Sequence, residues 1–297
     1  MKRNILVTGA HRSGSTWTGK IIAESKQVRY VQEPFNLAIK KYKTPLKHWF
    51  EHLNSETEAN YQEVVKRYLQ SFYSTSFQTS FQNLKQIRSA TNLYSFLLDV
   101  KRRNTCRTLF KDPIALMAAE WFYTEMNCDI ILTIRHPAAF IASLKVKDWQ
   151  FNFNNFLKQD ILMQKYLEAY RNEIVEQAAS KKDIIEQGIL LWNVLHYTIL
   201  QYREKYCNEL YFVKHEDLSI DPLDEFEKIF KFLQLNFSEE IKNKIKETTT
   251  STINTTHKRD ARQNIKTWKD RLSKEEIGRI KEETRIVWQH FYSEEDW

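Results

Sequence analysis

Short runs of consecutive apolar and β-branched residues recur along the chain, and each run ends in a polar cluster. They cover residues 4–8, 28–31, 107–110, 129–134 and 210–213. Unbroken runs of this length are typical of strands buried on both faces of a sheet. Longer segments with helical spacing separate them. The pattern therefore predicts an α/β fold in three layers, with a central, mainly parallel sheet of about five strands.

The segments between the strands predict a series of helices. The expected helices cover residues 15–25, 114–126, 153–179, 184–206, 222–233, 238–247 and 273–291, and a further helix is expected after Pro137. Residues 45–100 also have no strand alternation and are expected to be mostly helical. No internal repeat or linker divides the chain, so we expect one domain over residues 1–297, with a helical insertion at 40–105 and C-terminal helices.

Composition narrows the class of protein only slightly. The 297 residues are enough to bury a core without disulfides, and the net charge of +7 is spread along the chain. The three cysteines have no metal-ligand spacing, which predicts reduced thiols and no metal site. No apolar stretch has the length of a membrane span or of a secretory signal, so the expected location is cytoplasmic. The sequence does not indicate an oligomeric state.

The polar clusters at the strand ends are the candidate site. In open parallel sheets, ligands bind in the crevice outside the carboxyl ends of the strands. The clusters begin at Gly9, Glu33, Lys111, Arg135 and His215. We therefore expect these five positions to face one crevice.

The first of these clusters has the layout of a phosphate-binding loop. A strand is followed by Gly9, four residues, Gly14 and a helix, in which backbone N–H groups and the helix N-terminus can hold an anion. A nucleoside-triphosphate loop needs lysine directly after the second glycine, and here Ser15 stands there. A short-chain dehydrogenase would need a Tyr-x-x-x-Lys pair, and none of the fourteen tyrosines has lysine four positions on. The fold is thus expected to be P-loop-like, and the missing lysine argues against kinase chemistry.

The loop resembles the 5′-phosphosulfate loop of sulfotransferases that use 3′-phosphoadenosine-5′-phosphosulfate (PAPS). That family usually has Lys-Ser-Gly-Thr-Thr-Trp, and this chain has arginine in place of the lysine, as bacterial and carbohydrate-type members do. The resemblance implies that Arg12 contacts the phosphosulfate bridge and that the next four residues hold the 5′-phosphate, with an aromatic residue beside the adenine. The matching residues are Arg12, Ser13, Gly14, Ser15, Thr16 and Trp17.

A second motif is similar to the 3′-phosphate site of the same family. Arg135 follows a strand, and Ser143 comes eight residues later on the next helix. Arginine offers a forked set of donors that matches phosphate oxygens. Weaker similarities place His215 near the adenine and Arg262 in the late basic segment that closes over the 3′-phosphate.

The resemblance also implies catalytic roles at the strand ends. Lys111 resembles the lysine that steadies the transferring sulfuryl group together with Arg12. Glu33, in a Glu-Pro-Phe sequence, is the first candidate for the general base that a hydroxyl acceptor needs. Asp112 is the second candidate for this base, and His136 is expected to be structural. No metal is required.

Together these features predict a sulfotransferase that moves the sulfuryl group of PAPS to a hydroxyl, or an amine, of a small molecule or carbohydrate. The insertion at 40–105 is expected to shape the acceptor site. Its aromatic residues can either stack on an acceptor or form a helical core, and both remain open: Phe72, Tyr73, Phe77, Phe81, Tyr94 and Phe96. The alternative enzyme is a P-loop kinase of a small metabolite, which would bind ATP with Mg²⁺. No nucleic-acid-binding module is recognisable.

Overall fold

Five strands form one sheet in which every neighbouring pair is parallel. The computed structural model describes residues 3–74, 90–180, 183–249 and 265–297. The strands are β1 (Asn4–Gly9), β2 (Val28–Gln32), β3 (Arg107–Lys111), β4 (Cys128–Ile134) and β5 (Tyr211–Lys214), in the order β2-β3-β1-β4-β5. The predicted fold class is confirmed, and each strand differs from its predicted bounds by at most one residue at either end.

The strand order fixes where a ligand can bind. The chain leaves β1 toward β2 at one edge, returns through β3, and then crosses to β4 and β5 on the other side of β1. The connections therefore diverge between β1 and β4, which is the topological switch point of such sheets. The loops after these two strands begin at Ala10 and at Arg135. They lie side by side because Thr8 pairs with Leu132 and Gly9 with Thr133.

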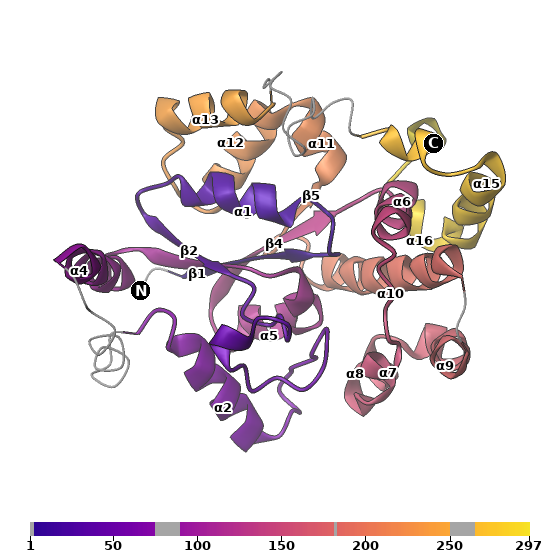
Figure 1. Cartoon of the computed structure of the whole chain (residues 1–297), viewed down its shortest axis with the longest axis horizontal. Helices are drawn as coiled ribbons and strands as arrows, with labels where there is room; N and C mark the ends of the chain where they lie inside the picture. The colour runs from indigo at the N-terminus through magenta and orange to yellow at the C-terminus, as the bar shows by residue number, and fades with distance from the viewer. Residues whose placement is uncertain (1–2, 75–89, 181–182, 250–264) are drawn as a thin grey trace.

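Helices cover both faces of the sheet (Figure 1). On one face, Ile5 and Val7 pack against α1 (Ser15–Ala23), α12 (Pro222–Phe232) and α13 (Glu239–Thr249). On the other face, Leu6 packs against α5 (Ala119–Thr124), α6 (Pro137–Lys147) and α10 (Ile184–Lys205). Successive strand residues point to opposite faces, so an unbroken apolar run supplies two cores at once.

The segment predicted as a helical insertion is only partly helical. It contains a 3₁₀ turn (Lys40–Tyr42), α2 (Ala59–Gln70) and α4 (Ala90–Thr105), which lies beside the β2 edge of the sheet (Figure 1). The expectation of helix is wrong for residues 45–58. In this segment, side chains accept the hydrogen bonds of backbone N–H groups that helix carbonyls would otherwise accept. The carboxylate of Glu51 accepts from the N–H groups of Lys47 at 2.9 Å and of His48 at 2.6 Å.

The single helix predicted over residues 153–179 is also wrong. The chain forms α7 (Asn154–Leu157), α8 (Asp160–Lys165), a 3₁₀ turn (Glu168–Tyr170) and α9 (Arg171–Ala179). The break lies at Gln159, whose amide nitrogen donates to the carbonyl of Phe50 at 3.2 Å while its oxygen accepts from the N–H of His52 at 2.7 Å. The glutamine thus ties this segment to residues 50–52.

The remaining elements need smaller corrections. A 3₁₀ turn (Pro113–Ala118) precedes α5, and α11 (His215–Ile220) follows β5 directly. The predicted helix at 273–291 is split into α15 (Lys274–Glu283) and α16 (Arg285–Trp288). Two more 3₁₀ turns, Thr267–Asp270 and Glu294–Asp296, flank this pair.

Candidate functional site

Two glycines set the conformation of the loop between β1 and α1. Gly9 has φ +138° and Gly14, the N-cap of α1, has φ +84°. A Cβ atom at Gly9 would lie 2.2 Å from the carbonyl oxygen of Thr133, and one at Gly14 would lie 2.4 Å from Nδ1 of His215. Both positions therefore need glycine, for backbone conformation and for space.

The hydroxyl groups of the loop face in different directions. Ser13 is fully buried, and its hydroxyl bonds to the Ala10 carbonyl and, at 2.5 Å, to the hydroxyl of Thr133. The Ser13 side chain therefore holds the loop to β4. Thr16 is exposed in the first turn of α1, and no side chain caps this helix N-terminus. The start of α1 is thus left with backbone N–H donors that can bind an anion.

Arg12, Arg135 and Ser143 are brought together from three elements. Arg12 Nε donates to Ser143 Oγ at 2.9 Å, and the Arg135 guanidinium donates to the carbonyl of Arg12. Burial lowers the pKa of Arg135, and the nearby Glu216 carboxylate partly offsets this effect. Arg135 Nε has no hydrogen-bond partner within the described part of the chain. Two guanidinium groups and a hydroxyl thus converge where the loops after β1 and β4 meet.

Glu33 and Lys111 form an ion pair at the ends of β2 and β3. The Lys111 ammonium, 1% exposed, contacts Oε1 of Glu33, and Asn36 Nδ2 donates to Oε2 at 2.7 Å. The stem of Lys111 passes under α1, since a Cβ at Gly19 would lie 2.9 Å from its Cγ. The glutamate is therefore oriented on both oxygens.

The carboxylate of Asp112, the second candidate base, accepts hydrogen bonds from two backbone N–H groups. Asp112 is fully buried, and its carboxylate accepts from the N–H of Phe35 at 2.5 Å and from the N–H of Ile114 at 3.0 Å. Burial raises its pKa to about 7, with the Glu33 carboxylate adding to the rise. These contacts cap the 3₁₀ turn after β3 and hold the segment after β2.

His136 lies among aromatic rings near the C-terminus. Its ring stacks on Trp268 with centroids 5.2 Å apart and meets Tyr292 edge-on at 5.0 Å. Burial lowers its pKa to about 3, so the ring is neutral at physiological pH. These contacts are those of a core residue.

The candidate adenine contacts lie on the α1 side of the sheet. Trp17 and His215 meet edge-on with ring centroids 6.4 Å apart, and Trp17 also packs edge-on against Phe226. Trp17 Nε1 donates to Thr248 at 3.3 Å. Burial and the Arg135 charge lower the pKa of His215 to about 3. Arg262 lies outside the described residues.

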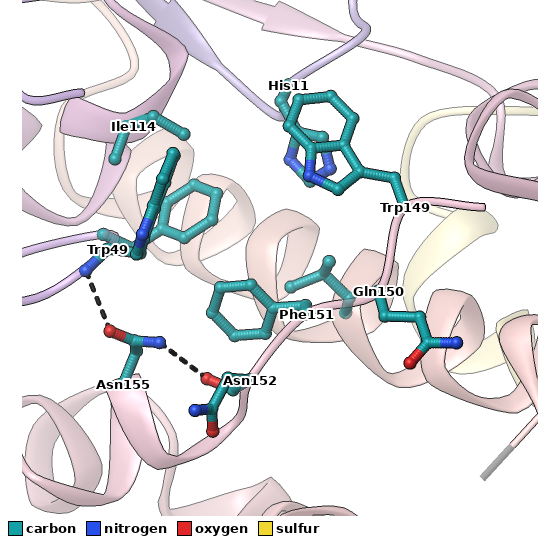
Figure 2. Close-up of a pocket in the computed structure, with 10 residues that line it drawn as sticks. His11, Trp49, Ile114, Trp149, Gln150, Phe151, Asn152 and Asn155 are labelled. Atoms are coloured by element: carbon teal, nitrogen blue, oxygen red, sulfur yellow. Dashed lines mark hydrogen bonds between the residues drawn. The ribbon is translucent and has the colours of Figure 1, made fainter. Parts of the chain in front are cut away.

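A cavity that the sequence did not predict opens beside the loop (Figure 2). Its volume is about 420 Å³, and we call it the aromatic cavity. Four aromatic rings line it: Trp49, Phe50, Trp149 and Phe151. The other lining residues are His11, Ile114, Leu191, Gln150, Asn152 and Asn155. Only His11, which lies between the two loop glycines, belongs to a motif that the sequence shows; the other described lining residues do not.

The aromatic residues singled out in the insertion have mixed surroundings. Phe72 and Tyr73 are partly buried and pack against the core that includes Phe110. Tyr94 is 65% exposed. Phe77 and Phe81, and the side chain of Phe96, lie outside the described residues. The core interpretation therefore holds for Phe72 and Tyr73.

Among residues 3–74, 90–180, 183–249 and 265–297, no group of acidic, histidine and cysteine side chains is arranged to hold a metal ion. Over the same ranges, no helix is long and apolar enough to cross a membrane.

A parallel sheet with a glycine-bounded loop after its central strand, and arginine at the end of the neighbouring strand, is an arrangement typical of proteins that bind phosphorylated ligands. Comparison with known families makes this specific. The model of the sulfotransferase family matches residues 4–239, and the chain belongs to that family. The family assignment predicted from the loop and the Arg135 motif is thereby confirmed, and the protein is a transferase.

Solved structures with the same fold include two sulfotransferase domains. One comes from the curacin biosynthetic pathway, with a TM-score of 0.51, 14% identity, and coverage of 96% of this chain and 98% of that one. The other comes from the olefin synthase of Synechococcus PCC 7002, with a TM-score of 0.51, 14% identity, and coverage of 98% and 96%. At this identity they support the fold alone. No curated protein sequence matches the chain.

Proposed function

We propose that this protein transfers the sulfuryl group of PAPS to a hydroxyl group of a small acceptor. The observation that carries the proposal is the convergence of Arg12, Arg135 and Ser143 beside the open N-terminus of α1. Two cations and a helix N-terminus suit a ligand with more than one phosphate-type group. PAPS has such groups at its 5′ and 3′ positions.

Each part of the donor has a proposed set of partners. The backbone from Ser13 to Thr16 would hold the 5′-phosphate, and Arg12 would reach the bridge to the sulfuryl group. Arg135 and Ser143 would bind the 3′-phosphate, with Arg262 contributing from the late basic segment. The adenine would lie near Trp17 and His215, whose rings meet edge-on. Arg12 must exchange its contact with Ser143 for one with the ligand.

Transfer itself would use the pair at the ends of β2 and β3. The acceptor oxygen attacks sulfur, the sulfur–oxygen bond to the 5′-phosphate breaks, and the hydroxyl proton passes to Glu33. Lys111 and Arg12 would stabilise the charge that develops on the leaving phosphate oxygen. The contacts to Lys111 and Asn36 orient the Glu33 carboxylate, which still has lone pairs for a proton. Asp112 is less suited, because its oxygens already accept two backbone N–H groups.

Binding of the product nucleotide tests the proposed donor. Adenosine-3′,5′-bisphosphate at a hundredfold excess over its Kd should raise the unfolding free energy by about 3 kcal/mol, measured as a thermal shift. ATP with Mg²⁺ should have little effect, because no lysine follows Gly14. Arg135→Ala should weaken binding at least about tenfold, since it removes a charged hydrogen bond. Arg67→Ala is the matched control, because that side chain is 75% exposed on α2. Stabilisation by ATP-Mg alone would favour the kinase instead.

Steady-state rates with PAPS test the proposed base. Glu33→Gln keeps the shape of the side chain but cannot take a proton, and should lower kcat at least about a hundredfold. Glu63→Gln, on the exposed face of α2, is the control. Rates close to wild type for Glu33→Gln would move the role to another group.

A further inference from the structure

The walls of the aromatic cavity carry no formal charge on any described lining residue. The lining comes from the loop after β1, from residues 49–50, from the 3₁₀ turn after β3, from residues 149–155 and from α10. Trp49, Phe50, Trp149 and Phe151 are aromatic, and no lysine, arginine, aspartate or glutamate is among the described lining residues. Moving a charged ligand from water into such surroundings is costly. The cavity therefore favours an uncharged ligand with a flat apolar body.

The carboxamides of Asn152 and Asn155 form hydrogen bonds with backbone groups of the cavity wall and of the residue next to it. Asn155 Oδ1 accepts from the N–H of Trp49 at 3.0 Å, and its Nδ2 donates to the carbonyl of Asn152 at 2.8 Å (Figure 2). Asn152 Oδ1 accepts from the N–H of Asn154 at 3.0 Å. Figure 2 shows the carboxamide of Gln150 directed away from His11. A sugar ring needs many free hydrogen-bonding groups, and these amides do not provide them.

His11 is a polar lining residue of this cavity with a buried ring nitrogen that lacks a hydrogen-bond partner within the described residues. It is 7% exposed, and its ring packs edge-on against Phe140 at 5.0 Å and Trp149 at 5.1 Å. Its Nδ1 has no hydrogen-bond partner among the residues that the structure describes. Burial, with the Arg12 charge, lowers the pKa of His11 to about 3, so the ring is neutral near pH 7. A neutral imidazole nitrogen can accept a hydrogen bond, and leaving it unmet in a buried place is unfavourable.

We infer that the aromatic cavity is the acceptor site and takes an uncharged, flat, apolar compound whose hydroxyl donates a hydrogen bond to His11 on binding. For transfer, this hydroxyl must turn from His11 to the Glu33 carboxylate, which is the proposed base. The inference rests on the proposed sulfuryl transfer. His11 directly precedes Arg12 in the loop that is proposed to hold the donor, so the cavity adjoins that loop. The 45% exposed ring of Trp149 forms the outer part of the wall, where it can cover the flat body of the acceptor.

Two probes that differ in one hydrogen bond test this inference. The full chain, saturated with adenosine-3′,5′-bisphosphate, is titrated with 2-naphthol and with 2-methoxynaphthalene, which has no hydroxyl donor. N-acetylglucosamine serves as a sugar of similar size. We expect 2-naphthol to bind at least about tenfold more tightly than the other two, which corresponds to one buried hydrogen bond and to the apolar wall.

Variants of the wall separate the two parts of the inference. His11→Leu should abolish the preference for 2-naphthol over its methyl ether, whereas His11→Asn keeps a polar atom near Nδ1 and should keep part of that preference. Trp149→Ala should weaken the binding of both naphthalene compounds by a similar factor, about tenfold, because stacking area is lost. Val146→Ala, 59% exposed at the end of α6, is the control for Trp149→Ala. Thermal unfolding of each variant checks that it is folded.

The outcomes are distinct from those for the donor. If adenosine-3′,5′-bisphosphate does not bind the wild-type protein, the proposed function fails. If it binds, but N-acetylglucosamine binds as tightly as 2-naphthol, the assigned acceptor class is wrong. An unchanged preference in folded His11→Leu would overturn the role of His11.

Discussion

Gly14 is the residue where the loop, the start of α1 and the end of β5 meet. Its φ of +84° and the 2.4 Å separation between an added Cβ and Nδ1 of His215 leave no room for a side chain. Gly14→Ala should lower the unfolding free energy by about 1–3 kcal/mol through backbone strain, and by more if His215 cannot move. It should also weaken nucleotide binding, because the backbone N–H groups of the loop shift.

Gly278→Ala provides the opposite control for that measurement. Gly278 lies within α15, and an added Cβ would contact nothing within 4 Å. Alanine there should raise the unfolding free energy by about 0.5–1 kcal/mol in a urea titration, because it favours the helix. Equal effects of the two substitutions would show that the conformation of Gly14 is not special.

At the residue scale, sequence spacing predicted part of the candidate site. Arg135 and Ser143 were expected together because their eight-residue spacing resembles that of the family's 3′-phosphate site, and the structure places both beside Arg12. Spacing could not show that Asp112 caps a turn or that Ser13 faces β4, since each depends on where a distant N–H or hydroxyl lies. His11 was missed because its orphan nitrogen is apparent only once Phe140 and Trp149 enclose it.

At the scale of elements, α10 depends on a cap that the structure makes explicit. The carboxylate of Asp183 accepts from the N–H groups of Ile185 at 2.8 Å and Glu186 at 3.0 Å, at the start of a 22-residue helix. Burial raises the pKa of Asp183, but these two backbone contacts and the Arg279 charge together hold it below the usual range. Asp183→Ala should cost about 0.5–2 kcal/mol of unfolding free energy, measured by urea titration.

Asp183→Asn separates the cap from the charge. The amide oxygen can still accept from the first turn of α10, while the ion pair with Arg279 at 3.4 Å is lost. That pair is largely solvent-exposed, so the asparagine variant should stay within about 0.5–1 kcal/mol of wild type. A loss as large as that of Asp183→Ala would assign the effect to the charge instead.

The accuracy of the predicted elements follows from the range of the interactions that form them. The five strands were predicted within one residue because a short apolar run that fills two cores has few alternatives. The helix predicted at 153–179 failed because Gln159 bonds to backbone groups at positions 50 and 52, far away in sequence. The helix predicted for residues 45–58 was wrong for the same reason. Asn155 and Gln159 accept hydrogen bonds from backbone N–H groups of this segment that helix carbonyls would otherwise have accepted.

At the scale of the whole molecule, both cores and the loops between them enclose histidines that cannot take a proton easily. Burial lowers the pKa of His11, His136, His196 and His215 from the ordinary 6.5 to about 3 in each case. Two buried acids behave in the opposite sense, because burial raises the pKa of Asp112 to about 7 and also raises that of Glu216. The stability of the fold is therefore linked to pH through several groups.

Between about pH 3 and 7, the folded and unfolded chains bind different numbers of protons. Between about pH 3 and 6.5, the unfolded chain protonates the four histidines and the folded chain does not, so the unfolding free energy rises with pH in that window. Above pH 3.8, Asp112 keeps a proton in the folded state up to about pH 7 that it has lost in the unfolded state, which reduces the slope. Because the histidines outnumber the raised acids, the protein should lose stability as the pH falls from 6.5 toward 4. Urea titrations across this range measure the slope of the unfolding free energy against pH.

His11→Asn, which cannot titrate, should make this slope shallower by about 1.4 kcal/mol per pH unit where unfolded histidine is fully protonated. A slope unchanged in that variant would mean that His11 takes up a proton in the folded protein, and the neutral imidazole on which its proposed contact with the acceptor depends would then be wrong.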